Sequence, residues 1–288
     1  MKDVKMYGQE FKKLRKTQGI TQIQATKGIC SSATLSRWEH EVTGIDFSTA
    51  VKLMERIHIT SHEFMGWSDY APEPDVNDEV WQALDSDDVP FIKRVTKEQL
   101  EKYHKTKDKF DLYIAASLCN VLYAIEKKNY LPEFDQKRLA DNFSKVKIWS
   151  EYYLSLFGSC VFLLEPRMVY GLSMNIIHDI DHIKKANTSY DLQVAMGSLG
   201  DAVIKLILGH DLNRAKSLLK ALQEIDLPQY MMFFPLTFTF LGKIINDLEN
   251  DKEEPVLEII NNLKMMNCKK AVSTFTEIWK KVKTAWHK

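Results

Sequence analysis

Cysteine is scarce in this sequence of 288 residues, with four thiols at positions 30, 119, 160 and 268. They form no Cys-x-x-Cys pair and no other metal-binding spacing, and cysteines this scattered are typical of reduced thiols in a cytosolic protein. Glycine and proline are also few, at eleven and eight residues, which favours helices over a turn-rich β architecture. We therefore expect a mainly helical protein of the cytoplasm.

Long apolar runs and net charge are missing as well. The longest mostly apolar run, Met231–Leu241, contains Pro235 and is too short to span a bilayer. No apolar or Arg-rich leader opens the chain, so we expect no targeting segment and no membrane partner. Basic and acidic residues number 39 each and 45% of residues are hydrophobic, as in an ordinary globular chain and unlike a disordered one.

Charge is distributed unevenly along the chain, which indicates two domains. Residues 1–67 hold ten basic against seven acidic residues. Residues 57–92 contain no Lys or Arg, nine acidic residues and three prolines, a composition that interrupts helices. The predicted organisation is a module over residues 1–68, a linker over 69–76 and a larger domain over 77–288.

Helix signals in the first module predict a bundle of short helices. Apolar residues at three- and four-residue spacing define one face of the first helix, namely Val4, Tyr7, Phe11 and Leu14. Gly19 ends that helix, and Thr21 with Gln24 forms a capping box for a second. Ser31 can cap a third helix, and residues 46–57 predict a fourth.

A short helix, a turn and a second short helix form the geometry that presents a helix to the DNA major groove. The residues in this pattern are Leu14-Arg15-Lys16, Gly19-Ile20-Thr21-Gln22, Ala25, Ser31 and Leu35-Ser36-Arg37-Trp38-Glu39. With these residues, the segment 4–66 resembles the lambda-repressor-like (Xre/Cro-type) helix-turn-helix. One departure is Glu41, which stands where a glycine usually ends the third helix.

The resemblance implies which side chains contact double-stranded DNA. Gln22 would touch a phosphate, and Thr34 would lie close to the DNA backbone. Ser32, Ala33 and Arg37 would reach base edges, where an arginine bonded to guanine is worth about 1–3 kcal/mol of discrimination. Basic residues outside the apolar face of the first helix would steer DNA and contact phosphates; they are Lys12, Lys13, Arg15 and Lys16.

The alternative for this module is a helical bundle that binds no DNA and whose basic face is merely solvated. Two side chains are expected to be structural in either case. Glu39 would pair with the region around Arg15, and Trp38 would lie in the core.

The larger domain predicts an all-helical solenoid. Helix-breaking clusters interrupt the apolar periodicity at residues 127–132, 165–167, 186–190, 209–213, 226–230 and 250–255. The intervals 186–226 and 209–250 are close to the length of one helical hairpin, and stacked hairpins leave a concave groove. The turn Gly209-His-Asp-Leu-Asn-Arg-Ala215 is similar to that of a tetratricopeptide-like repeat.

A second resemblance covers most of the chain. Its central motif is Trp149-x-x-Tyr152-Tyr153-Leu154-x-Leu156-Phe157-Gly158-x-Cys160, and its N-terminal part is Ile45-Asp46-Phe47-Ser48 with Thr60-x-x-Glu63-Phe64. These residues resemble the Rgg/GadR/MutR family of transcriptional regulators. The resemblance implies a cytoplasmic homodimer that binds promoter DNA and takes up a short, often hydrophobic, signalling peptide in its repeat domain.

The peptide site can be carried over only in part. The residues that the motif suggests are Tyr152, Tyr153, Ser159 and Phe162. Ser159 stands where family members often have Asn, and Phe162 replaces an often polar position, so the groove is expected to be more apolar or to bind a different peptide. The alternative is that the aromatic residues are repeat core. Residues 231–236, rich in Met and Phe, fit either an adaptable binding surface or a subunit contact.

Other chemistry has weaker support. His178 and His182 are expected on one helix face, where they could ligate zinc, but a third ligand is missing. We expect no metal, no cofactor and no enzymatic activity, since phosphate-binding and nucleophile motifs are absent. The predicted function is a DNA-binding regulator controlled by a peptide. Two alternatives stay open: a constitutive repressor whose repeats only dimerise or dock a protein, and a metal-dependent enzyme using the two histidines.

Overall fold

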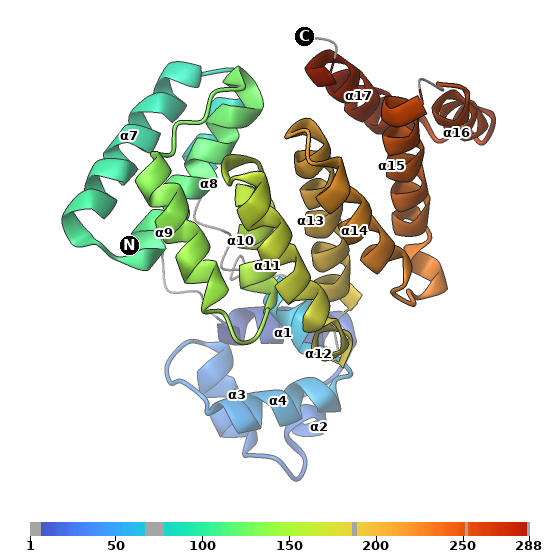
Figure 1. Ribbon diagram of the computed structural model, residues 1–288. Coiled ribbons are helices and arrows are strands. Elements are labelled where there is room, and N and C mark those ends of the chain that lie inside the picture. The colour runs from blue at the N-terminus through green and yellow to red at the C-terminus, as the bar shows by residue number, and fades with distance from the viewer. Residues whose placement is uncertain (1–6, 67–77, 186–188, 251–252, 287–288) are drawn as a thin grey trace. The chain divides into compact units, whose positions relative to one another are not determined.

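A computed structural model describes residues 7–66, 78–185, 189–250 and 253–286. The chain divides into two compact units, residues 1–73 and 74–288, and each is described by itself. Every regular element in the described residues is a helix, which confirms the predicted all-α class (Figure 1). The predicted linker over 69–76 and the predicted core residue Val4 lie outside the described residues.

The first unit is a bundle of short helices. They are α1 (Tyr7–Thr17), α2 (Gln22–Thr26), α3 (Ser32–Glu39), α4 (Phe47–Arg56) and α5 (Ser61–Gly66). Phe11 of α1, Leu35 and Trp38 of α3 and Leu53 of α4 meet in its core, each less than a tenth exposed. The predicted placement of Phe11 and Trp38 is thus confirmed, because side chains three and four apart share a face of a helix.

Local hydrogen bonds fix where these helices begin. Thr21 and Gln24 form both bonds of the predicted capping box at the start of α2, and the Ser31 hydroxyl accepts from Thr34 N at the start of α3. At the end of α3, Glu41 adopts φ 58°, the left-handed conformation that favours glycine. The backbone thus turns in the left-handed conformation at Glu41 although the glycine is missing.

The second unit is a stack of antiparallel helices. Its elements are α6 (Asp78–Asp85), α7 (Val89–Thr106), α8 (Lys109–Glu126), α9 (Glu133–Ser144), α10 (Glu151–Cys160), η1 (Val161–Leu163), α11 (Pro166–His178), α12 (Ile180–Lys185), α13 (Ser189–Leu208), α14 (Leu212–Gln223), η2 (Gln229–Met231), α15 (Phe233–Asn250), α16 (Glu254–Met265) and α17 (Lys269–Trp286). Helices α9, α11, α13, α14 and α16 begin within or directly after predicted joints, and α15 follows its joint after η2. Residues 186–188 and 251–252 of two joints lie outside the described residues. The last helix begins three residues before the predicted Val272.

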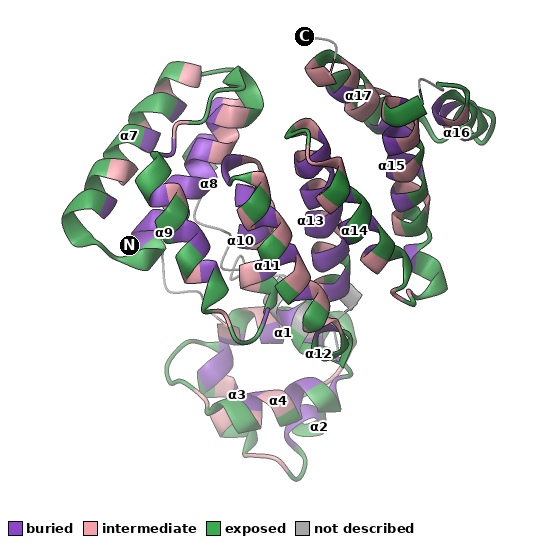
Figure 2. Ribbon diagram, in the orientation of Figure 1, coloured by how far each residue is buried: buried purple, intermediate pink, exposed green. Residues whose placement is uncertain are grey.

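Helix α13 is the centre of the second unit. It packs against α10 and α11 on one side and against α14 and α15 on the other (Figure 1), and most of its residues are buried (Figure 2). The approach of α10 is close at Gly158, where a Cβ atom would lie 2.5 Å from Ser198 Oγ. Ser198 in turn donates to the Leu154 carbonyl at 3.1 Å, so this crossing is both packed and hydrogen-bonded.

Two further contacts explain the sequence around α13. A Cβ atom on Gly209, in the turn to α14, would lie 2.6 Å from Pro166 Cγ at the start of α11. The glycine of the repeat-like motif therefore permits close packing of this turn against the start of α11. On α17, Trp286 Nε1 donates to the Ile207 carbonyl at 3.0 Å, and its ring lies 4.4 Å from that of His210. The last helix is thereby docked on the central one.

The expectation that His178 and His182 share one helix face is wrong. Helix α11 ends at His178, and Asp179 interrupts the path to α12. At this interruption, an Asp179 carboxylate oxygen accepts a hydrogen bond from Trp149 N at 3.1 Å. Among the described residues, no three His, Cys, Asp or Glu side chains are grouped to hold a metal ion. Within the same residues, every helix falls short of the length and apolar character needed to span a bilayer.

Candidate DNA- and peptide-binding sites

Helix α3 presents the side chains that the helix-turn-helix resemblance assigns to DNA. Ser32, Ala33 and Arg37 are exposed, whereas Leu35 and Trp38 on the opposite face are buried. This separation leaves the polar face of the helix available for base edges in a major groove. Thr34 is half-buried, and its hydroxyl lies 2.8 Å from that of Ser31. It therefore supports the start of the helix in this structure.

A buried polar network joins α1, α2 and α3. Glu39 is fully buried and accepts from Arg15 Nε at 2.6 Å and Arg15 Nη2 at 2.8 Å. Gln22 Nε2 donates to the same carboxylate at 2.8 Å. Burial raises the pKa of the Glu39 carboxyl, but these hydrogen bonds and the Arg15 charge outweigh burial, so the pKa lies below its usual value. The expected partnership of Glu39 with the Arg15 region is present.

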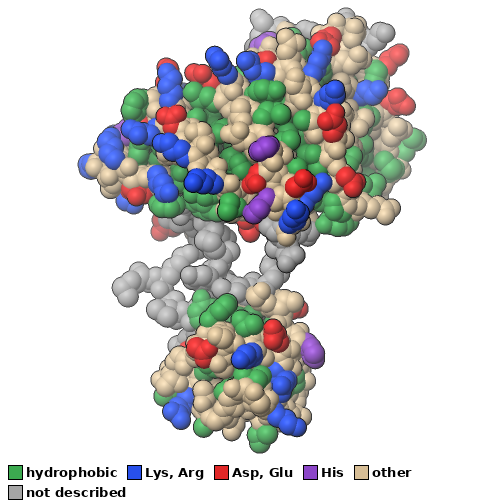
Figure 3. All heavy atoms as spheres, turned by 60° about the horizontal axis from the view of Figure 1, so that its bottom comes forward, with side chains coloured by type: hydrophobic (Ala, Val, Ile, Leu, Met, Phe, Trp, Pro, Cys, Tyr) green, Lys and Arg blue, Asp and Glu red, His purple; other side chains and the backbone are tan. Residues whose placement is uncertain are grey.

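Arg15 lies in the core of the first unit and not on its surface, where a contact with DNA phosphates was expected. It is only 5% exposed and its charge is neutralised by Glu39. Its spacing already carried the signal, because Arg15 follows Phe11 by four residues and so shares the buried face of α1. Lys13 and Lys16 are exposed on the same helix. Lys and Arg side chains are spread over the face of the first unit that Figure 3 presents.

The predicted peptide-binding residues fall into two groups. Tyr152 and Ser159 share one partly exposed face of α10, and Phe162 follows in η1. Tyr153 points about 100° away from Tyr152 around the helix and packs edge-on against it. Phe157 is fully buried, so the repeat-core alternative holds for this aromatic residue. Tyr152 and Ser159 therefore share a face of α10, whereas Phe162 lies beyond the end of that helix.

Phe162 is tied to both neighbouring helices. Its ring stacks on Tyr123 of α8, with centroids 6.4 Å apart and an interplanar angle of 13°. Its carbonyl accepts a hydrogen bond from Lys205 Nζ of α13 at 2.7 Å. Phe162 thus lies where α8, η1 and α13 meet, beside the central helix.

The α13 stripe is a row of partly exposed residues on this otherwise buried helix. Its members are Val194, Gly197, Asp201, Lys205 and Leu208, which recur at three- and four-residue spacing and so share one face. Sequence reasoning missed Asp201 and Lys205. The available signal was that, from 192 to 208, they are the only Asp, Glu, Lys or Arg residues in an apolar run.

Burial perturbs both charged groups of the α13 stripe. It raises the pKa of Asp201 to about 6, although the positive charge of Lys281 on α17 opposes the shift. It lowers the pKa of the Lys205 ammonium group. Perturbed groups of this kind mark functional sites more often than ordinary surface charges do.

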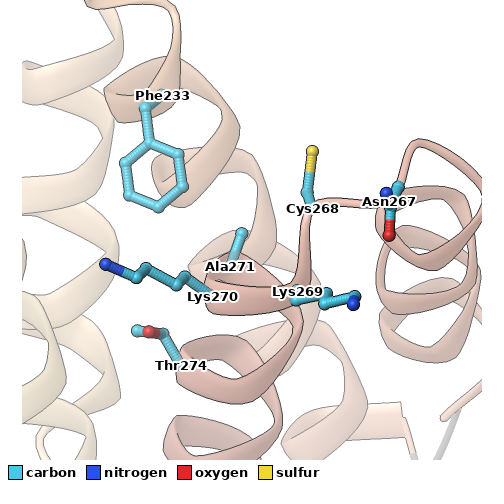
Figure 4. A pocket seen from close by; sticks show the side chains of 7 residues that line it. All are labelled: Phe233, Asn267, Cys268, Lys269, Lys270, Ala271 and Thr274. Carbon is cyan, nitrogen blue, oxygen red and sulfur yellow. The ribbon is translucent and has the colours of Figure 1, made fainter.

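A separate cavity of about 630 Å³ lies between the start of α15 and the start of α17. Phe233 faces Ala271 and Lys270 across it, with Cys268 in the preceding loop (Figure 4). Phe233 belongs to the Met- and Phe-rich run that the sequence singled out, and the adjacent Met232 is 73% exposed. A smaller cavity of about 260 Å³ lies between α14 and α15. The predicted peptide-binding residues line neither of these two cavities.

A helix-turn-helix unit followed by a stack of helical hairpins is the architecture of a DNA-binding regulator with a ligand-responsive domain. A family model described as HTH-type transcriptional regulator Rgg, C-terminal domain, matches residues 93–277. The chain belongs to this family, as the motif around Gly158 predicted. No curated protein sequence matches the chain.

Solved structures share this fold over nearly the whole chain. The Streptococcus dysgalactiae SHP pheromone receptor Rgg2 superposes with a TM-score of 0.73 at 15% identity, covering 96% of this chain and 99% of that chain. PrgX, in its complex with cCF10, gives a TM-score of 0.71 at 15% identity, covering 98% of this chain and 94% of that chain. At this identity, the similarity establishes the fold.

Proposed function

We propose that this protein is a sequence-specific DNA-binding transcriptional regulator controlled by a short signalling peptide. The observation that supports DNA binding most directly is the two-faced α3, exposed at Arg37 and buried at Trp38. Two such units in a homodimer would dock on half-sites about 34 Å apart, one helical turn of DNA. Lys13 and Lys16 would contact phosphates, so that binding weakens steeply with salt.

Control by a peptide is supported by the family to which the chain belongs and by the partly exposed α13 stripe. The structural neighbours are described as a pheromone receptor and as a complex with cCF10. In this chain, Tyr152, Ser159 and Phe162 on α10 and η1 would receive the peptide together with the α13 stripe. The peptide can act only by preferring one arrangement of the repeats or of the dimer over another. The chain would act in the cytoplasm, without cofactor and without catalysis.

A second candidate is a constitutive repressor whose repeat unit only dimerises or docks a protein. The observation that favours it is the docking of α17 on α13 through Trp286 and Ile207. In that case the last helix would restrict access to α13, and the repeats would have no small ligand.

Fluorescence anisotropy with the duplex upstream of the protein's own gene tests both candidates. The titration is run at several salt concentrations, with and without the peptide fraction of the source organism's culture medium. Salt-sensitive binding that the peptide fraction alters supports the peptide-controlled regulator. Salt-sensitive binding that the fraction leaves unchanged, together with unchanged transcription from this duplex, would favour the constitutive repressor. Equal binding to a scrambled duplex would contradict sequence-specific recognition.

A further inference from the structure

Asp201 and Lys205 lie one helical turn apart on the α13 stripe, yet they do not pair with each other. Opposite charges at this spacing on a helix are neighbours and ordinarily attract. Lys205 Nζ instead donates to the Phe162 carbonyl at 2.7 Å. Within the described part of the chain, the Asp201 carboxylate has neither a hydrogen bond nor an ion pair. The stripe therefore holds a carboxylate whose natural partner is engaged elsewhere.

Space beside Asp201 is open. A Cβ atom on Gly197, one turn earlier on the same face, would meet no atom within 4 Å. Gly197 and Asp201 are both partly exposed, so the carboxylate borders volume that a ligand can enter. The positive charge of Lys281 on α17 acts on Asp201, but Lys281 is exposed to solvent and forms no ion pair with it among the described residues.

An unpaired carboxylate in a largely apolar setting is costly, since burial removes its hydration without supplying a partner. A ligand that brings a positive charge recovers that cost, and a charge-assisted hydrogen bond is stronger than a neutral one. An apolar or acidic ligand would leave Asp201 unpaired and desolvate it further. The local chemistry thus selects for a cation.

We propose that Asp201 is the anchor for a cationic group of the signalling peptide, so that the peptide is apolar with one positive charge. This inference rests on the proposed peptide control. The charge comes either from the N-terminal ammonium group or from a Lys or Arg side chain. Lys205 is a positioning residue, because its bond to the Phe162 carbonyl holds η1 on α13 and leaves Asp201 free for the ligand.

Affinity selection on the purified full chain, read out by mass spectrometry, tests this assignment. The probes are matched libraries of short synthetic peptides with randomised apolar positions. They carry either one Lys or the uncharged norleucine, and each is made with a free and with an acetylated N-terminus. We expect the wild type to enrich cation-bearing over uncharged peptides by about tenfold or more, the size of one charge-assisted bond. The acetylated libraries identify which ammonium group is recognised.

Variants separate a charge effect from a folding defect. Asp201→Asn is expected to abolish the preference for cations, whereas Asp201→Glu keeps the charge and retains a preference. Asp226→Asn removes an exposed carboxylate from a loop and should select the same peptides as the wild type. Circular dichroism establishes that each variant is folded.

The outcomes are distinct. Peptides enriched without regard to charge, or a preference that survives Asp201→Asn, would overturn the role of Asp201 and leave peptide control standing. If no library peptide is enriched and the culture-medium fraction changes neither DNA binding nor transcription from the same duplex, then peptide control and the cationic anchor both fail. A preference that Asp201→Asn loses and Asp201→Glu keeps supports both.

Discussion

Gly158 and Ser198 meet where α10 packs against α13, and a Cβ atom on Gly158 would lie 2.5 Å from Ser198 Oγ and 3.3 Å from Ser198 Cβ. Ser198 Oγ is held by its bond to the Leu154 carbonyl. A side chain at position 158 must therefore either break that buried bond or separate the helices. The glycine of the family motif is explained by this contact.

Gly158→Ala should accordingly destabilise the second unit by about 1–3 kcal/mol, the usual cost of overpacking a core. Thermal unfolding followed by circular dichroism measures the change. Ser198→Ala in the same chain removes the hydroxyl and should recover part of the loss. Gly171 is an exposed helical glycine, and a Cβ atom added to it would meet no atom within 4 Å. Gly171→Ala is therefore the matched control and should not destabilise.

Removing the Arg15 side chain should lower the denaturant concentration at which the first unit unfolds. Arg15→Met leaves the Glu39 carboxylate buried without its charge partner, which costs about 3–5 kcal/mol. The double variant Arg15→Met with Glu39→Leu should be more stable than Arg15→Met alone, since no charge is then buried. Hydrogen exchange of α1 and α3 reports this unit separately. An Arg15→Met protein with wild-type protection would contradict the assignment of Arg15 to the core.

Arg37→Ala should weaken operator binding by about 1–3 kcal/mol and relax sequence preference at one base pair. The reason is the loss of a donor pair from the exposed face of α3. Lys52→Ala removes an equal charge from an exposed position on α4 and controls for electrostatic attraction alone. Anisotropy titrations on operator and single-substituted duplexes measure both variants. Equal losses on operator and scrambled DNA would assign Arg37 to phosphate contact instead.

Asp201→Asn should raise stability at neutral pH. The pKa of Asp201 is about 6 in the folded chain, above the unfolded value of about 3.9. The folded state therefore binds the proton more tightly, and stability falls as pH rises from about 4 to 6. The cost is complete above pH 6, and the favourable charge of Lys281 is already included in the pKa of about 6. The variant should gain about 1–3 kcal/mol at pH 7.5 and nothing below pH 4.

Urea unfolding across this pH range measures the difference between Asp201→Asn and the wild type. A constant offset at every pH would mean that the substitution acts through packing. A less stable variant at pH 7.5 would mean that the carboxylate is paired in the folded chain.

Local signals made much of the fold predictable from sequence. The capping pair Thr21 and Gln24, and the helix breaks such as Glu165 before Pro166, are decided by residues close in the chain. The contact between Asp179 and Trp149 was not predictable, because the two residues are thirty positions apart. Apolar periodicity in a sequence identifies which side chains share a face of a helix, but not which distant residues pack against that face.

In the candidate sites, too, some features follow from residues close in the chain and others depend on distant contacts. Exposure of Arg37 on α3 follows from spacing alone. The freedom of Asp201 depends on Lys205 reaching the Phe162 carbonyl, a contact across forty-three residues. A sequence can mark Asp201 as an unusual charge in an apolar run, but only the packing of η1 on α13 shows that its carboxylate has no partner among the described residues.

Helix α13 spans 20 residues, a rod of about 30 Å at 1.5 Å per residue. The bond from Ser198 to α10 and the bond from Trp286 at Ile207 are attached to this rod on either side of Asp201. A tilt of the rod at Asp201 would therefore move α10 and α17 in opposite senses. A ligand that tilts α13 at Asp201 would therefore displace α10 and α17 together, without unfolding any helix.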